Sequence, residues 1–69
     1  MKSFVGTVRH NDLEGGFFEL VTDDGQVFRL QGGEVRDGQR VKVDGEIERG
    51  GFGLHMSGPS IIVRAVHPG

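Results

Sequence analysis

The chain has no cysteine, tryptophan or tyrosine, and it holds one alanine and two prolines among its 69 residues. Without cysteine, neither a disulfide nor a thiolate-bound metal can reinforce the small core, and the composition fits a reducing cytoplasm. The sequence also lacks any run near the ~20 apolar residues of a membrane span, and it lacks the apolar segment of a signal peptide. We therefore expect a soluble cytoplasmic protein, complete from its own Met1, that does not bind a membrane.

A large net charge of either sign is also absent. The 8 lysines and arginines against 10 aspartates and glutamates give a formal net charge of −2. That balance provides no long-range attraction to nucleic acid or to anionic lipid, although a local basic face is compatible with it.

A chain of this length forms one domain, residues 1–69, and buries only about 60% of the surface that its unfolded form exposes. Such a core leaves little room for an internal active site.

What the sequence does contain is glycine and β-branched residues, with 13 glycines, nine valines and three isoleucines. These residues favour strands and turns over helices. Apolar and polar residues alternate with the period of two that marks a half-buried strand. We expect strands at 2–9, 17–22, 26–30, 41–48, 52–56 and 60–66. Asp24 and Gly25 predict a hairpin turn between the second and third of these, and the glycine-rich segment 31–39 is too short and irregular for more than one helical turn.

The same alternation assigns a side of the sheet to each residue. The inward positions are Phe4, Gly6, Val8, Phe18, Leu20, Phe28, Leu30, Val41, Val43, Ile47, Leu54, Met56, Ile61, Val63 and Ala65. Glu19 is expected to face water. A change of side at residues 57–59, where proline interrupts the ladder, places Ile62 and Val66 outside. Exposed together, these two form an apolar stripe, so we expect a monomer or a weak homodimer, with a protein partner as another way to cover the stripe.

Glycines inside two of the expected strands, Gly6 and Gly45, indicate a barrel. Glycine lets a strand coil sharply enough to pair on both sides. Closure into a barrel also removes exposed strand edges. The sequence thus predicts an all-β fold, a small five- to six-stranded antiparallel barrel with no long helix.

Several short motifs resemble those of small OB-fold barrels, which have five strands. They are the run from Gly38 to Gly45, the Gly6-Thr7-Val8 stretch and the turn at Asp24-Gly25. A narrower likeness, carried by residues 14–18, 24–28 and 55–59, is to an uncharacterised family of small bacterial domains. That family has a Gly-Gly-aromatic start to its second strand and a Met-x-Gly step near its end. The resemblance implies an OB-like barrel; because 31–39 is too short for the helix that OB-folds often carry there, an SH3-like barrel is the alternative.

Two corners of the chain repeat the same local chemistry, since residues 13–17 and 49–52 each place two glycines before a phenylalanine. In an OB-like barrel the corresponding loops flank the outer face of the second and third strands, where oligonucleotides and oligosaccharides bind. The resemblance therefore implies a contact set made of Phe17, Val27, Arg29, Arg49 and Phe52. The alternative is that the glycines only turn the chain and the phenylalanines plug the barrel ends.

We expect a non-enzymatic binding or interaction module that takes a partner protein or a small ligand on the face of the second and third strands. The alternative is weak binding of single-stranded nucleic acid through the same face, by stacking of bases on phenylalanine. The net charge of −2 disfavours it, because such binding draws on several arginine or lysine contacts to phosphate. A purely structural domain within a larger assembly is a third hypothesis.

Patterns typical of catalysis or of metal binding are absent from the sequence. His10, His55 and His67 lie far apart, with no cysteine and no acidic residues at ligand spacing, so we expect no metal and no cofactor. The three serines stand in no arrangement with a histidine and an acid that would support nucleophilic catalysis. We therefore expect that the protein is not an enzyme.

Overall fold

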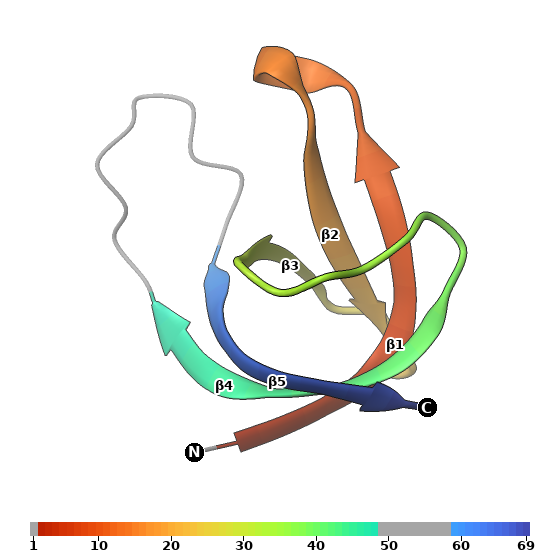
Figure 1. Cartoon of the computed structure of the whole chain (residues 1–69), viewed down its shortest axis with the longest axis vertical. Helices are drawn as coiled ribbons and strands as arrows, with labels where there is room; N and C mark the ends of the chain where they lie inside the picture. Colours follow the sequence, from red (N-terminus) through yellow and green to blue (C-terminus); the bar gives the residue numbers. More distant parts are fainter. Residues whose placement is uncertain (1, 49–58) are drawn as a thin grey trace.

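The structure, a computed structural model, describes residues 2–48 and 59–69. Its elements in chain order are β1 (Lys2–Asn11), a 3₁₀ turn η1 (Leu13–Gly15), β2 (Phe17–Thr22), β3 (Val27–Gln31), β4 (Arg40–Glu48) and β5 (Ser60–Pro68) (Figure 1). Each strand coincides with a stretch of period-two alternation, and the loop 32–39 between β3 and β4 contains no helix. The strand expected at 52–56 lies outside the described residues.

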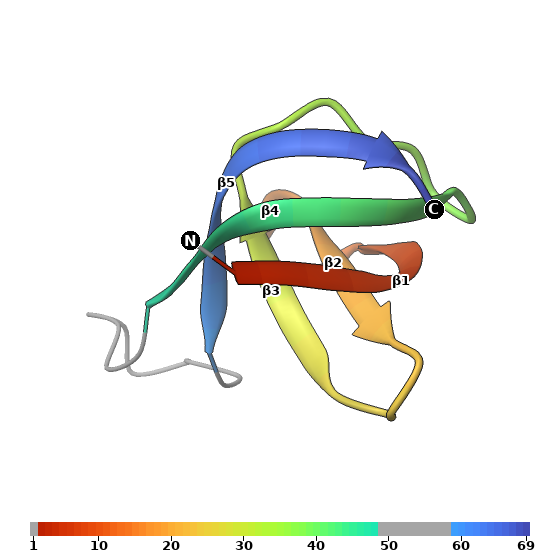
Figure 2. The same ribbon diagram turned by 90° about the horizontal axis from the view of Figure 1, so that it is seen from below.

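The five strands form a closed barrel in the order β1-β2-β3-β5-β4. This confirms the expected small all-β barrel without a long helix. Four of the neighbouring pairs are antiparallel, whereas β3 and β5 are parallel, from the Arg29–Ser60 pair to the Gln31–Ile62 pair. Figure 2 shows β1, β4 and β5 side by side in one layer, while β2 and β3 cross behind them at a steep angle.

Among the residues that the structure describes, seven apolar side chains fill the barrel, and every strand contributes at least one of them. They are Val8, Leu20, Phe28, Leu30, Val41, Val43 and Ile61. The alternation predicted an inward position for all of them. Full burial of such a side chain is worth about 1.5–3 kcal/mol, so this cluster is the main stabilising element of the fold. Phe4, Phe18, Ile47 and Val63 pack against it as predicted, together with Val35 and Val66.

The second half of β5 differs from the prediction. Alternation predicts Ala65 in the core and Val66 outside, but Val66 packs against the core cluster. The cause is a β-bulge: the register with β4 shifts between Asp44 and Gly45, which leaves Arg64 as an extra residue on β5. An extra residue reverses the side to which all the following side chains point. The apolar stripe predicted on the outside therefore loses Val66.

Two glycines lie where neighbouring strands approach too closely for any side chain. A Cβ on Gly6 would lie 2.1 Å from the carbonyl oxygen of Val21, and a Cβ on Gly45 would lie 2.3 Å from the carbonyl oxygen of Ile62. Both glycines are buried within their strands. Because these residues have no side chain, β1 can pack closely against β2, and β4 against β5, where the sheet curves to close the barrel.

We predict that Gly6→Ala lowers the free energy of unfolding by about 3 kcal/mol, because the new methyl group must push β2 away from β1. Gly38→Ala is the matched control. A Cβ there would meet nothing within 4 Å, and only its φ of +83° opposes the substitution, at a cost of about 1–2 kcal/mol. Urea unfolding followed by circular dichroism measures both variants. An equal loss in the two would contradict the explanation by close strand approach.

Candidate functional site

The outer surface of β1, β2 and β3 carries the residues of the expected binding face. Antiparallel pairing sets them in three cross-strand rows, which are Thr7–Val21–Val27, Arg9–Glu19–Arg29 and Asn11–Phe17. We call these residues the β1–β3 face. Residues two apart along a strand point to the same side, so the rows form one continuous surface that combines apolar, aromatic and charged groups.

Glu19 lies at the centre of the β1–β3 face and is only 6% exposed. The prediction that it faces water is therefore wrong. Its Oε1 accepts hydrogen bonds from Arg9 Nε at 3.3 Å, from Arg9 Nη2 at 3.1 Å and from Asn11 Nδ2 at 3.5 Å. Arg9 stands beside it on β1 and Arg29 on β3, and such long side chains cover neighbouring surface with their stems. A buried carboxylate is tolerated when it is paired and hydrogen-bonded in this way.

Arg29 stacks on Phe17. The guanidinium carbon of Arg29 lies 4.3 Å from the centre of the Phe17 ring, and both residues are half-buried. A cation over an aromatic face contributes about 0.5–1 kcal/mol at an exposed site, which holds the two groups in a fixed relation. The pair offers a flat surface with N–H donors at its rim. It can stack against a planar group and donate hydrogen bonds to an oxygen acceptor.

The structure brings together three of the predicted contact residues, Phe17, Val27 and Arg29. Val27 is 36% exposed and pairs with Val21 across the β2–β3 hairpin, which gives the face an apolar end opposite Phe17. The other two predicted residues, Arg49 and Phe52, lie outside the described residues.

The predicted contact set did not include Arg9, Asn11 and Glu19. β1 continues to Asn11, beyond its expected end at Arg9, and this extension sets Asn11 beside Phe17. The alternation of outward residues from Thr7 onward could have indicated the extension, because it continues without a break. Asparagine and aspartate next to paired glycines are also typical of a loop, and that pattern concealed it.

The first Gly-Gly corner directs the chain from β1 into β2. Gly15 and Gly16 have φ values of +86° and +99°, a region that favours glycine. The N–H of Gly16 donates to the carbonyl of Leu13 at 2.9 Å. In this corner the glycines turn the chain, which is the role that the simpler of the two hypotheses assigns to them.

Away from the β1–β3 face, hydrogen bonds hold Asp23, Asp24 and Asp44 in their ionised form. Hydrogen bonds from Arg40, at 3.0 and 2.7 Å, lower the pKa of Asp23. The pKa of Asp44 is lowered first by the hydroxyl of Ser3, which donates to it at 2.7 Å, and then by His67 at 2.9 Å. These pairs tie the turn between β2 and β3, and both ends of the chain, to β4, so their role is structural.

On the part of the surface that the described residues form, hollows of about 650, 620 and 510 Å³ are lined by none of Arg9, Glu19 and Arg29. Within 2–48 and 59–69, no group of three or more histidine or acidic side chains is placed to hold a metal ion. In the same part of the chain, no helix is long and apolar enough to cross a membrane. The chemistry available on the β1–β3 face is therefore stacking, apolar contact and hydrogen bonding over an open surface.

Comparison with known proteins gives one family. The family described as Protein of unknown function (DUF5818) matches residues 5–66, a span that includes most of every strand of the barrel. No curated protein and no solved structure matches the chain.

We predict that Glu19→Gln lowers the free energy of unfolding by about 1–2 kcal/mol, because the donors from Arg9 lose their charged acceptor at a buried position. Glu46→Gln is the control, since Glu46 accepts from Arg64 at 3.2 Å but is 55% exposed. Its loss should stay below about 0.5 kcal/mol. Thermal and urea unfolding of both variants give the comparison. If the two losses are the same, Glu19 does not organise the face.

A second prediction concerns acid. Because the folded-state pKa of Asp44 lies below its ordinary value of 3.8, its ionised form stabilises the folded chain above that pH. This contribution is lost as the pH falls through the folded-state pKa. In an NMR titration of the carboxyl carbon, Ser3→Ala should shift the pKa of Asp44 upward, and Asp44→Asn should make the acid-induced loss of stability less steep. A titration of Asp44 at or above 3.8 in the original chain would contradict this.

Proposed function

The chain belongs to DUF5818, a family of proteins of unknown function, and we propose that it is a non-enzymatic binding module. Its contact surface is the β1–β3 face, and its ligand is a partner protein or a small molecule. The cysteine-free composition supports a place for this module in a reducing cytoplasm, and the resemblance of its motifs supports a bacterial origin.

The order of the strands supports an OB-like barrel. β5 enters between β3 and β4 and runs parallel to β3, and in OB-like barrels the face of the second and third strands is the surface that binds. Fold alone does not determine function. The proposal therefore depends on the side chains that this chain carries on that face.

The observation that carries the proposal is the stack of Arg29 on Phe17 beside the buried Glu19. Glu19 fixes the guanidinium of Arg9 through two hydrogen bonds. The guanidinium of Arg29 stacks on the Phe17 ring, which holds it in place. Binding is stronger when the contact groups are already ordered, because less conformational freedom is lost. A flat, ordered surface of this kind suits a planar or carboxylate-bearing group, such as one from a peptide or a small aromatic acid.

The charges on this face make single-stranded nucleic acid the second candidate ligand, after a partner protein or a small molecule. Glu19 offsets the charge of Arg9, and the chain as a whole has a net charge of −2. Non-specific affinity for a single strand grows with the number of phosphates that lysine and arginine neutralise. The β1–β3 face offers two arginines for that purpose, Arg9 and Arg29, although the Phe17 ring favours stacking of a base.

Site-specific photo-crosslinking in cells tests the proposal. We expect a benzoylphenylalanine in place of Phe17 to form adducts with one protein or small molecule, identified by mass, and the same group in place of Lys42, on the outer side of β4, to form none. Arg29→Ala in the crosslinking chain should reduce the yield by about five-fold or more, as loss of one anchoring contact does. Equal adducts from positions 17 and 42, or none from position 17, would contradict the proposal.

An oligonucleotide titration separates the two candidate functions. A short oligothymidylate is added to the isotope-labelled chain at low and at moderate salt, and backbone amide shifts are followed. Absence of shifts up to millimolar oligonucleotide is the expected result. Salt-sensitive shifts confined to β2 and β3 would replace the first candidate with the nucleic-acid function.

A further inference from the structure

β5 is paired on both sides over only part of its length. On one side it pairs with β4 from Ser60 to Pro68, whereas on the other side its ladder with β3 ends at Ile62. Residues 63–68, which we call the β5 edge, therefore have β4 as their only strand neighbour within the described ranges. Figure 1 shows β5 curving away from β3 as it runs toward the C-terminus.

The backbone of Val66 points to the open side of this edge. The N–H of Gly69 donates to the carbonyl of Arg40, at the start of β4, at 3.2 Å. Backbone groups alternate between the two sides along a strand, so His67 directs its N–H and C=O toward β4, and Val66 directs its own away from β4. In the part of the chain that the structure describes, no backbone hydrogen bond joins 63–68 to the loop 32–39. Such a row of unpaired groups is a template for another strand.

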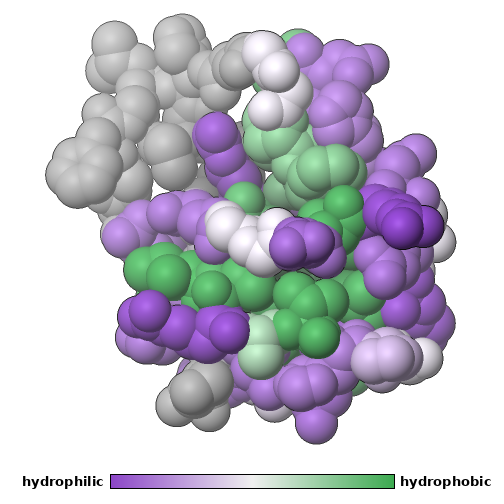
Figure 3. Space-filling view, in the orientation of Figure 1, coloured by the Kyte–Doolittle hydropathy of each residue, from purple (hydrophilic) through white to green (hydrophobic). Residues whose placement is uncertain are grey.

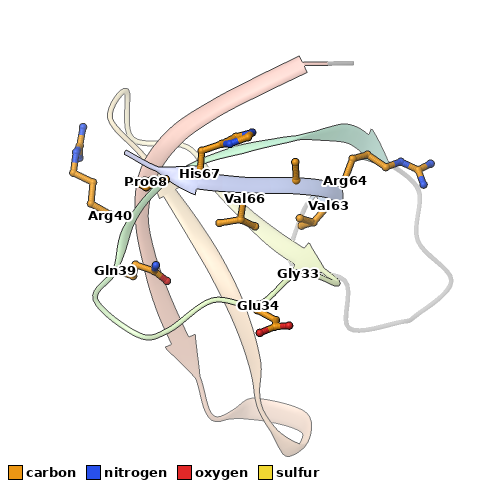
Figure 4. A pocket seen from close by; sticks show the side chains of 10 residues that line it. Gly33, Glu34, Gln39, Arg40, Val63, Arg64, Val66, His67 and Pro68 are labelled. Atoms are coloured by element: carbon orange, nitrogen blue, oxygen red, sulfur yellow. The ribbon is translucent and has the colours of Figure 1, made fainter.

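A groove of about 650 Å³ runs along the β5 edge, between this edge and the β3–β4 loop. Figure 4 shows Val63 and Val66 on β5, with Glu34 and Gln39 on the loop across the space from them. Gly33 brings the loop into contact with β5, since a Cβ there would lie 2.8 Å from a methyl group of Val63. The loop thus touches the valines at one place and leaves a hollow beside the unpaired backbone.

The groove combines apolar surface with polar and charged groups, which are Glu34 on the loop and Arg64 and His67 on β5. Val63, Ala65 and Val66 are half-buried, and Figure 3 shows an apolar band across this face with hydrophilic surface on both sides. Arg64 and His67 have side chains that are 53% and 50% exposed. Each contacts an acidic residue of β4, but a guanidinium has five N–H donors, so Arg64 retains donors for a second carboxylate.

We propose that the β5 edge is a docking site for an extended segment of a partner protein, which joins the barrel as a further strand. In strand addition, main-chain hydrogen bonds supply affinity and alternate side chains supply specificity. The segment carries small apolar side chains toward Val63 and Val66. It carries an acidic side chain toward Arg64 and His67, because opposite charges on neighbouring strands stabilise a sheet. This site is separate from the β1–β3 face and does not depend on the function proposed for that face.

A single extended segment fits this groove better than a second copy of the chain. The β3–β4 loop stands along the groove, so a whole barrel reaches the β5 edge only by displacing that loop, whereas a lone strand enters beside it. Pairing of two β5 edges would also bring Arg64 and His67 of each copy toward like side chains of the other, which is unfavourable between neighbouring strands.

Amide hydrogen exchange of the full chain, measured by NMR, tests the proposal with an internal control. The probe is an acetylated and amidated peptide in which valine alternates with glutamate and threonine. In the free chain, the amide of Val66 should exchange about ten-fold faster, or more, than that of His67, which faces β4. The peptide should slow exchange at Val66 by a similar factor and leave His67 unchanged.

Two matched controls test the mode of binding. A peptide N-methylated along one edge should fail to protect Val66, because it cannot donate to the strand. Arg64→Glu should weaken binding of the glutamate peptide by about five-fold. The same variant should favour a peptide with lysine in place of glutamate. Unchanged exchange of the His67 amide shows that the fold of the variant is intact.

Three results would overturn the proposal. The first is that the N-methylated peptide protects the Val66 amide as well as the unmodified peptide does, or that neither peptide protects it. The second is slow exchange at Val66 in the free chain at every concentration, which would show that the chain covers its own edge. The third is protection that rises with protein concentration while light scattering shows a dimer, which would make a second copy the occupant.

Discussion

The fold depends on the short parallel ladder between β3 and β5. β3 leaves β2 after the pair of Glu19 with Arg29, and Arg29 is already the first residue paired with β5. Without this ladder the five strands would form one open antiparallel sheet in the order β3-β2-β1-β4-β5. The close strand contacts at Gly6 and Gly45 let β1 and β4 curve far enough to bring β3 and β5 together. Because the ladder is short, the strand ends beyond it diverge.

Both candidate surfaces follow from this closure, and they use different chemistry. The β1–β3 face lies on strands that stay paired, so its side chains form ordered rows, with Glu19 buried among donors. The β5 edge lies where β5 has moved away from β3, so its open groups belong to the main chain. The first surface can recognise a shape and a charge. The second can recognise an extended backbone, with Arg64 adding a preference for acidic residues.

Alternation along the sequence predicted the strands and the seven buried apolar residues, because the side to which a residue points is a local property of an extended chain. It misplaced Val66, since a bulge arises from the register of β5 on β4. It placed Glu19 on the correct, outer side of the sheet but did not predict its burial, which depends on neighbours from β1 and β3. Phe17, Val27 and Arg29 share one face, as alternation predicts, because they lie on one hairpin, whose turn sets their register.

The sequence by itself determined where the strands and turns lie and which apolar residues face inward. These features follow from the chemistry of residues close together in the chain, which period-two patterns and Asp-Gly turns express directly. Only the tertiary structure decided that β3 and β5 run parallel, that Glu19 is enclosed, and that Val66 turns its side chain inward and its backbone to an open groove. Each of these depends on contacts between strands far apart in the sequence, and no local pattern encodes how such strands meet.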